Sequence, residues 1–165
     1  MSKILISGYY GFANAGDEAM LTAIIESLRQ VEKNVELTVL SGNPEDTAAK
    51  HQVCSVYRFN PLGIIRAMKD SELIISGGGS LLQDVTSKRS LLYYLSIIGL
   101  GKFFGKKVML FAQGIGPIRA KWARKLTSLV CNEADLITVR DSESAAELIE
   151  MGVKPEKITV TADSV

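Results

Sequence analysis

Short apolar runs alternate with longer amphipathic segments along the whole chain. The runs at 4–7, 73–76, 108–111 and 136–139 are almost continuously apolar, which predicts strands buried on both faces. Further strands are predicted at 35–40, 53–57 and 158–161, and helices at 17–31, 61–69, 89–104, 119–131 and 142–151, with a short helix from Pro44. This order predicts an α/β fold, in which a doubly wound, mainly parallel, Rossmann-like sheet carries helices on both faces.

Two of the predicted helices carry an apolar stripe at helical spacing, and we expect both stripes to be buried. The stripe in 17–31 consists of Met20, Ile24, Leu28 and Val31. The stripe in 119–131 consists of Trp122, Leu126, Leu129 and Val130. The helix at 142–151 carries end signals, because Asp141 can cap its start and Gly152 can end it in a left-handed conformation.

Length and composition fit one globular domain. The chain has 165 residues, of which 47% are hydrophobic and 22% charged, and its formal net charge is +1. A charge so close to zero gives no general attraction to nucleic acid, so no nucleic-acid partner is expected. The first residues lead directly into a strand without an apolar export region, which predicts a cytoplasmic protein. Because the sequence stops just after a strand, we expect 1–165 to be a single N-terminal domain that lacks a C-terminal partner domain.

One segment raises the question of membrane contact. Residues 91–100 are almost wholly apolar, and Lys102, Lys106 and Lys107 follow them. The run is too short to span a bilayer, which takes about 20 apolar residues. The pattern favours a helix buried against a sheet. The alternative is a surface helix that touches the inner face of the membrane peripherally through its apolar side and the lysines.

Unusual residues follow four of the predicted strands. In an open parallel sheet, ligands bind at the carboxyl ends of the strands. Here those ends carry the segments 8–18, 77–84, 113–117 and 140–141, which contain glycine, amide and charged residues in place of generic turn residues. The sequence therefore predicts the site at this edge of the sheet.

The first of these segments is neither a dinucleotide fingerprint nor a P-loop. Its glycine spacing does not match GxGxxG, and no Gly-Lys-Ser/Thr follows. Asp17 and Glu18 occupy the start of the helix, where they would repel a phosphate. Asp17 either caps the helix or accepts a hydrogen bond or a proton from a sugar hydroxyl. In the second case Tyr9, Tyr10 and Phe12 would offer ring faces to a pyranose.

The segments after the later strands offer backbone and side-chain donors. Three glycines at 77–79 let the backbone approach a ligand closely and present N–H groups to it, although a tight turn is an equal alternative. Gln113 is the hydrogen-bonding group of the next segment. Arg140 ends a buried strand, and its guanidinium suits a carboxylate or a phosphate, the alternative being an ion pair with Asp141. With His51 as the one histidine, no imidazole metal site is expected.

Four blocks taken together resemble the bacterial polysaccharide pyruvyl transferases, of the type that modifies secondary cell-wall polymers. They are GYYGFANAGDEAML at 8–21, ELIISGGGSLLQD at 72–84, FAQGIGP at 111–117 and TVRDSESAAELIEMG at 138–152. The resemblance implies one half of a two-domain fold like that of the GT-B glycosyltransferases. It also implies that phosphoenolpyruvate donates a pyruvyl group, as a cyclic ketal, to an N-acetylmannosamine-type sugar on a lipid-linked saccharide. No metal or cofactor is required in principle.

The resemblance also suggests roles for individual residues. As catalytic residues we expect Asp17, which orients or deprotonates the acceptor, and Arg140, which faces the anionic donor. The substrate-binding candidates are Tyr10, Asn14, Gly16, Glu18, Gly78, Gly79, Ser80, Gln83, Asp84, Gln113 and Gly114. Because the family's C-terminal domain is expected to supply the basic residues and the histidine that hold phosphoenolpyruvate, residues 1–165 alone are not expected to catalyse transfer.

Two other functions stay open on the sequence. A GT-B glycosyltransferase that uses a nucleotide sugar would share the fold and the glycine-rich segments. A non-catalytic sugar-binding or assembly module would leave Asp17 and Arg140 with purely structural roles.

Overall fold

The computed structural model describes residues 2–85 and 87–161, and it gives Gly78 only as part of a strand. The strands are β1 (Lys3–Ser7), β2 (Glu36–Ser41), β3 (Cys54–Tyr57), β4 (Leu73–Leu82), β5 (Lys107–Ile115), β6 (Leu136–Val139) and β7 (Ile158–Val160). The helices are α1 (Ala15–Val31), α2 (Pro44–His51), α3 (Pro61–Asp70), α4 (Lys88–Phe103), α5 (Lys121–Glu133) and α6 (Ser142–Met151), with a 3₁₀ turn at Pro155–Lys157.

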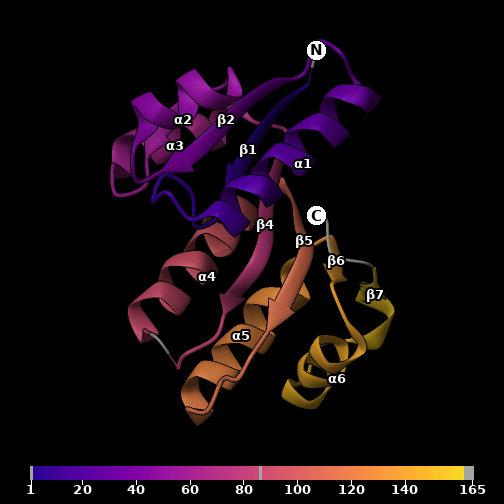
Figure 1. Cartoon of the computed structure of the whole chain (residues 1–165). Helices are drawn as coiled ribbons and strands as arrows, with labels where there is room; N and C mark the ends of the chain where they lie inside the picture. Colours follow the sequence, from indigo (N-terminus) through magenta and orange to yellow (C-terminus); the bar gives the residue numbers. More distant parts are fainter. Residues whose placement is uncertain (1, 86, 162–165) are drawn as a thin grey trace.

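The strands of the described residues form one parallel sheet in the order β3-β2-β1-β4-β5-β6-β7 (Figure 1). The chain first moves outward from β1 to β3 and then crosses back to β4, which pairs with the other side of β1. The strand order therefore reverses between β1 and β4, and such a switch point is where open α/β sheets bind ligands. The predicted doubly wound, Rossmann-like fold is confirmed.

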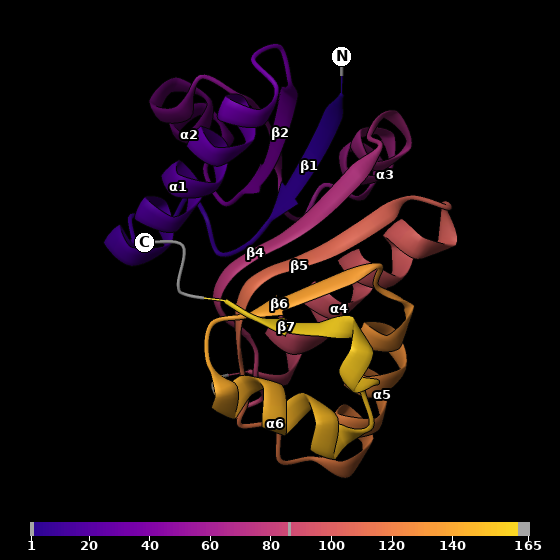
Figure 2. The ribbon, with the colours of Figure 1, turned by 90° about the vertical axis from the view of Figure 1, so that its right-hand side faces the viewer.

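Helices cover both faces of the sheet, and alternate residues of each strand enter different cores. Leu5 of β1 belongs to the large core beneath α3, α4, α5 and α6, whereas Ile4 and Ile6 belong to a smaller core beneath α1. Figure 2 shows α1 and α2 on one side of the sheet and α3, α4 and α5 on the other. The continuously apolar strands are thus explained by burial on two faces.

The apolar segment near 91–100 forms α4 and packs on the sheet. Leu91, Leu95 and Ile98 are buried and belong to the same core cluster as Ile74 of β4. A Cβ built on Gly101 would lie 2.6 Å from Cδ1 of Ile74, so the end of this helix approaches the sheet closely. Burial against a sheet is therefore confirmed. In the described part of the chain, no helix combines the length and apolarity needed to cross a membrane.

Strands β4 and β5 are longer than the sequence predicts. The tight turn that is one alternative for 77–79 is absent, because Gly77 pairs with Phe111 and Gly79 with Gln113. A register shift between Gly79 and Leu82 marks an irregularity in this extension. The glycine-rich segments therefore extend β4 and β5, which stay paired with each other beyond the end of β1.

Both predicted apolar stripes are partly wrong. Val31, at the end of α1, is 87% exposed. In α5, Trp122 and Leu129 are exposed, and the buried positions are Ala123, Thr127 and Cys131. The helix α5 packs against both α4 and α6, and its smaller residues lie inward. The end signals of α6 are confirmed, with Asp141 capping its start and Gly152 in the left-handed conformation at its end.

One tyrosine fixes the first loop to the sheet. The Tyr10 side chain is 2% exposed. A Cβ at Gly8 would lie 2.4 Å from its Cζ, and a Cβ at Gly77 would lie 2.6 Å from its hydroxyl oxygen. The phenol ring therefore occupies the space that side chains at these two glycines would fill.

We predict that Gly77→Ala destabilises the fold by about 1–3 kcal/mol, the usual cost of overpacking a core. The matched control is Gly99→Ala within α4, where no atom lies within 4 Å of the added methyl group. Because alanine favours helix over glycine, the control should stabilise by up to about 1 kcal/mol. Urea unfolding measures both changes, and equal effects of the two variants would contradict the close packing of Tyr10.

Candidate functional site

The expected edge of the sheet carries a cavity of about 390 Å³. It lies where the loop after β1 meets the extension of β4 and the start of α4, and it is lined by Tyr9, Asp17, Ser80, Leu81, Gln83, Ser90 and Tyr94. Three of the residues predicted from the sequence, Asp17, Ser80 and Gln83, therefore meet in one hollow. Their role in binding stays a prediction.

Asn14, and not Asp17, caps helix α1. The Asn14 side chain accepts a hydrogen bond from the backbone N–H of Asp17 at 3.2 Å, and the Asn14 carbonyl accepts one from Glu18 at 2.9 Å. The capping alternative for Asp17 is therefore wrong. Its carboxylate instead lies over the extension of β4, because a Cβ at Gly79 would be 3.1 Å from Asp17 Oδ1. Gly79 has a φ of +75°, which also favours glycine there.

The Asp17 carboxyl is half-buried, and this environment favours its neutral form. Burial, and next the charge of Glu18, raises the pKa of Asp17 above the ordinary value. A carboxylate with a raised pKa binds a proton more readily than a solvated one.

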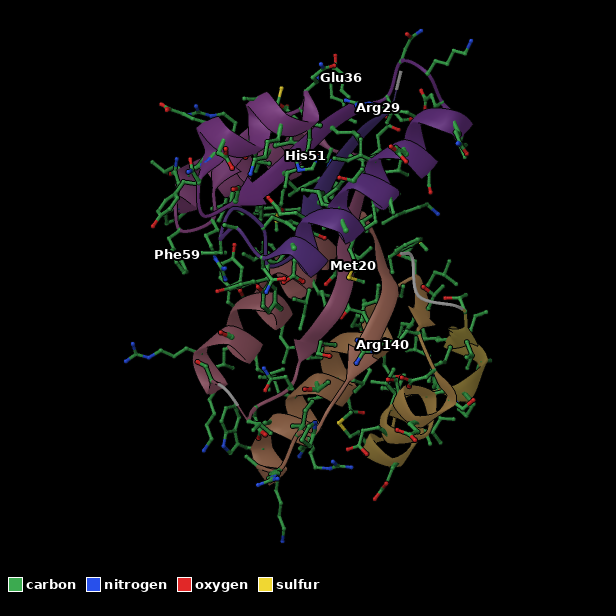
Figure 3. The ribbon with its side chains drawn as sticks, viewed as in Figure 1. Met20, Arg29, Glu36, His51, Phe59 and Arg140 are labelled. Carbon is green, nitrogen blue, oxygen red and sulfur yellow. The ribbon has the colours of Figure 1, made fainter. Side chains whose placement is uncertain are left out.

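Arg140 lies on the same edge and reaches the cavity through Ser80 (Figure 3). Its Nη2 donates a hydrogen bond to Ser80 Oγ at 3.0 Å, and its Nε lies 3.6 Å from Asp141 Oδ2. Asp141 also accepts the capping bond of Ser144 N–H at 2.7 Å, so its carboxylate is shared. The ion pair with Asp141 is therefore observed, whereas an anionic ligand of Arg140 stays a prediction; the side chain keeps 35% of its surface exposed.

A glycine makes room for this guanidinium. A Cβ at Gly114 would lie 2.5 Å from Cζ of Arg140, so any side chain at this position would displace it. Gly114 is thus a support for Arg140 and offers no side chain of its own. Gly114, in the extension of β5, leaves space for the guanidinium, and Ser80, in the extension of β4, accepts a hydrogen bond from it.

Several predicted binding residues have other surroundings. Tyr10 is wrong as a ring face for a sugar, because its side chain is buried beneath two glycines. Gln113 is fully buried, and its amide donates to the Ser76 carbonyl at 2.8 Å. Asp84 accepts hydrogen bonds from the backbone N–H groups of Arg119 and Ala120 at 3.0 Å, which lower its pKa and anchor that loop. These bonds stabilise the loops around the cavity.

The remaining candidates do not meet in the cavity. Glu18 lines a different hollow, between α1 and α2, together with Arg29 and His51. Gly16 lies exposed in the first turn of α1. Gly78 falls outside the residues whose surroundings the structure describes. Among the described residues, no group of three His, Cys, Asp or Glu side chains is arranged to hold a metal ion.

The sequence did not single out some residues that the structure brings to this edge. Tyr94 and Ser90 line the cavity from α4, which the sequence presents only as an apolar segment. Two of the three rings that the sequence did suggest, Tyr9 and Phe12, stack with ring centroids 4.4 Å apart and form an exposed aromatic surface. Arg58 follows β3 as Arg140 follows β6, and that shared position after a strand was the available signal.

Solved structures with a similar fold include proteins whose descriptions name UDP-glucose, UDP or a galactosyltransferase. An Anabaena protein, HepE, in complex with UDP-glucose has a TM-score of 0.71 and 15% identity over 99% of this chain and 44% of its own. S. aureus MnaA with UDP has a TM-score of 0.58 and 16% identity over 99% and 44%. The lipopolysaccharide outer core galactosyltransferase WaaB, in its apo form, has a TM-score of 0.59 and 16% identity over 97% and 45%.

These similarities concern the fold alone, given the low identities, and they confirm the expected GT-B-like architecture. The chain spans less than half the length of each of these proteins. A comparison with curated proteins gives no match. The family model for polysaccharide pyruvyl transferase, in contrast, matches residues 14–165. The chain therefore belongs to the polysaccharide pyruvyl transferase family.

Proposed function

We propose that this chain forms the acceptor side of a pyruvyl transferase, which moves a pyruvyl group from phosphoenolpyruvate to two hydroxyls of a sugar. The observation that carries the proposal is the state of Asp17. Its backbone N–H is capped by Asn14, its carboxyl faces a cavity, and its raised pKa suits a proton acceptor. Membership of the family supplies the reaction class.

The lining of the cavity suits an amino sugar such as an N-acetylmannosamine-type residue. Asp17, Ser80 and Ser90 offer polar atoms to hydroxyl or amide groups, and Tyr9 offers an exposed ring to the apolar face of a pyranose. A few polar groups within a partly aromatic hollow is the usual composition of a small-molecule site. The sugar is carried on a lipid-linked saccharide, which places the reaction at the cytoplasmic face of the membrane.

The reaction balances with one proton acceptor on this side. The oxygen of the acceptor hydroxyl bonds to the central carbon of phosphoenolpyruvate, whose methylene carbon gains a proton and becomes a methyl group. The hydroxyl proton passes to Asp17. The carbon–oxygen bond to phosphate then breaks and releases inorganic phosphate, and the second hydroxyl adds to the same carbon and closes the ketal. Of the two hydroxyl protons, one replaces the proton that a general acid gives to the methylene carbon, and the other leaves with the phosphate.

Arg140 takes the anionic donor in this proposal. Its guanidinium donates to Ser80 at the edge of the cavity and keeps part of its surface exposed. A guanidinium binds carboxylate or phosphate through paired hydrogen bonds, so it can hold the donor next to the acceptor. The remaining cations for the donor come from a C-terminal partner domain in this proposal.

The second candidate function is transfer from a nucleotide sugar. It is favoured by the structural similarity to HepE in complex with UDP-glucose. Against it stands the charge at the start of α1, where Asp17 and Glu18 occupy the helix end that would otherwise attract a diphosphate.

We predict that an N-acetylmannosaminide shifts the amide NMR signals of the residues that line the Asp17 cavity. Asp17→Asn should weaken this binding about fivefold, because a bond to a charged acceptor is replaced by a weaker neutral one. The matched control is Glu26→Gln, an acid of the same helix that lines a different hollow and should change affinity less than about twofold. If UDP-glucose shifts these signals and the amino sugar does not, the nucleotide-sugar function replaces the proposed one.

We also predict opposite effects of two carboxyl-to-amide changes on stability. Because the pKa of Asp17 is raised in the folded protein, its ionisation costs stability once pH exceeds the ordinary value of about 3.9. Asp17→Asn should therefore raise the free energy of unfolding at neutral pH, and the gain should vanish in acid.

Asp84→Asn serves as the control of opposite sign. Backbone hydrogen bonds from Ala120 and Arg119 lower the pKa of Asp84, so its ionised form stabilises the fold above the ordinary value. This variant should lose stability at neutral pH, and the loss should shrink as pH falls through the lowered pKa. Urea unfolding across pH measures both effects, and a destabilised Asp17→Asn at neutral pH would contradict the assigned environment.

A further inference from the structure

A second arginine lies buried among aromatic rings at the end of β3. The Arg58 side chain is only 6% exposed. Within the part of the chain that the structure describes, no carboxylate lies within ion-pair distance of it. Aromatic faces attract a cation, so rings can stabilise a guanidinium in place of a counter-ion. The Arg58 Cζ lies between 4.6 and 5.9 Å from five ring centroids, those of Tyr93, Phe59, Phe12, Tyr94 and Tyr9.

The guanidinium connects parts of the chain that are far apart in sequence. Tyr9 and Phe12 belong to the loop after β1, whereas Tyr93 and Tyr94 belong to α4. The backbone of Arg58 is itself fixed on two sides. Its N–H donates to the Ser41 carbonyl at the end of β2 at 3.0 Å, and its carbonyl accepts a hydrogen bond from the Tyr93 hydroxyl at 2.8 Å. The side chain therefore joins the loop after β1 to α4 from a fixed base.

Two of the five rings also line the cavity that contains Asp17. They are Tyr9, which is 41% exposed, and Tyr94, which is 3% exposed. One belongs to the loop after β1 and the other to α4, so the width of the cavity depends on how the loop sits against the helix. Arg58 does not line this cavity. It contacts the rings of the cavity wall, and these rings separate it from a ligand beside Asp17.

The Tyr94 hydroxyl responds to both Arg58 and Asp17. Burial raises the pKa of Tyr94, the charge of Arg58 opposes that rise, and the charge of Asp17 adds to it. The phenol is therefore neutral near pH 7 and can donate a hydrogen bond. Tyr94 thus lies between the buried cation and the half-buried carboxyl of the candidate site.

We propose that Arg58 is a positioning residue of the acceptor site, which holds Tyr9 and Tyr94 at the spacing that admits a sugar ring beside Asp17. It acts through these two rings and does not touch the sugar. The inference deepens the proposed function and rests on it for the identity of the ligand as an amino sugar.

The chemistry of arginine suits this role. A guanidinium is planar and weakly hydrated, and it stacks on aromatic faces, so one group can contact rings on several sides. Lysine keeps the charge as a compact, strongly hydrated ammonium, which serves fewer rings at once. A methionine fills much of the same space without any charge. These differences allow the attraction to the rings to be separated from the filling of space.

The first test is NMR spectroscopy of the tyrosine rings in the free chain. Arg58→Met should move the ring signals of Tyr9 and Tyr94 towards those of free tyrosine, because both rings lose the cation that holds them. Tyr10 serves as the internal control. Its ring is held by Gly8 and Gly77, so its signals should stay in place. Unchanged signals of Tyr9 and Tyr94 overturn the proposal, and so does an equal shift of Tyr10, which would indicate a general loss of the fold.

The second test measures the affinity for the N-acetylmannosaminide. Arg58→Met should weaken binding about tenfold, and Arg58→Lys should weaken it only about threefold, because the charge remains. The control is Arg124→Met, which removes a part-buried arginine of α5 that pairs with Glu147, and it should change affinity less than about twofold. Wild-type affinity in Arg58→Met overturns the proposal, as does an equal loss in Arg124→Met.

A further variant keeps the proposal testable if Arg58→Met does not fold. Phe59 is 59% exposed, projects from the edge of the molecule (Figure 3) and does not line the Asp17 cavity. Phe59→Leu removes one ring of the cage, so it should shift the Tyr9 and Tyr94 signals in the same direction as Arg58→Met. The control is Phe103→Leu, at the end of α4, where the ring is 81% exposed. Equal effects of these two variants overturn the proposal.

The two kinds of measurement separate this inference from the proposed function. If the wild-type chain does not bind the amino sugar, the proposed function fails, and the ring signals of the free chain still decide whether Arg58 positions Tyr9 and Tyr94. If the sugar binds and the Arg58 variants bind it equally well, the positioning role fails and the proposed function stands.

Discussion

The candidate site depends on the close contact between one tyrosine ring and two glycines. Tyr10 lies between Gly8 and Gly77, where neither position has space for a side chain. This contact holds the loop after β1 against the extension of β4. It therefore sets where α1 begins, and with it the position of Asp17 above Gly79. An exposed carboxylate on a free loop would have neither its raised pKa nor its place in the cavity.

The two long central strands complete the arrangement. Because β4 and β5 keep pairing beyond the end of β1, they bring Ser80 and Gly114 to opposite sides of the Arg140 guanidinium. Ser80 thus links Asp17 and Arg140, because it lines the same cavity as Asp17 and accepts a hydrogen bond from Arg140. Arg58 adds a second cation near this cavity, because it contacts the rings of Tyr9 and Tyr94, which line it.

The sequence predicted the fold class and the edge of the sheet where Asp17 and Ser80 line one cavity, because strand order and glycine placement follow from local pattern. It did not predict that the glycines at 77–79 continue a strand, since the partner strand that keeps them paired is distant in sequence. Tyr10 was predicted as a ring face for a sugar, but its side chain is buried. Burial of this kind depends on tertiary contacts, which the local sequence pattern does not show. Arg58 was missed because its aromatic neighbours come from three separate segments.

The central claim is that the Asp17 carboxyl is a half-buried group that accepts a hydrogen bond from a sugar hydroxyl. Carbon-detected NMR titration of this carboxyl, without and with the N-acetylmannosaminide, tests it most directly. The account predicts a pKa above the ordinary value of about 3.9 in the free protein, and a lower pKa with sugar, because a donated hydroxyl stabilises the ionised form. A pKa at or below the ordinary value that the sugar leaves unchanged would contradict it.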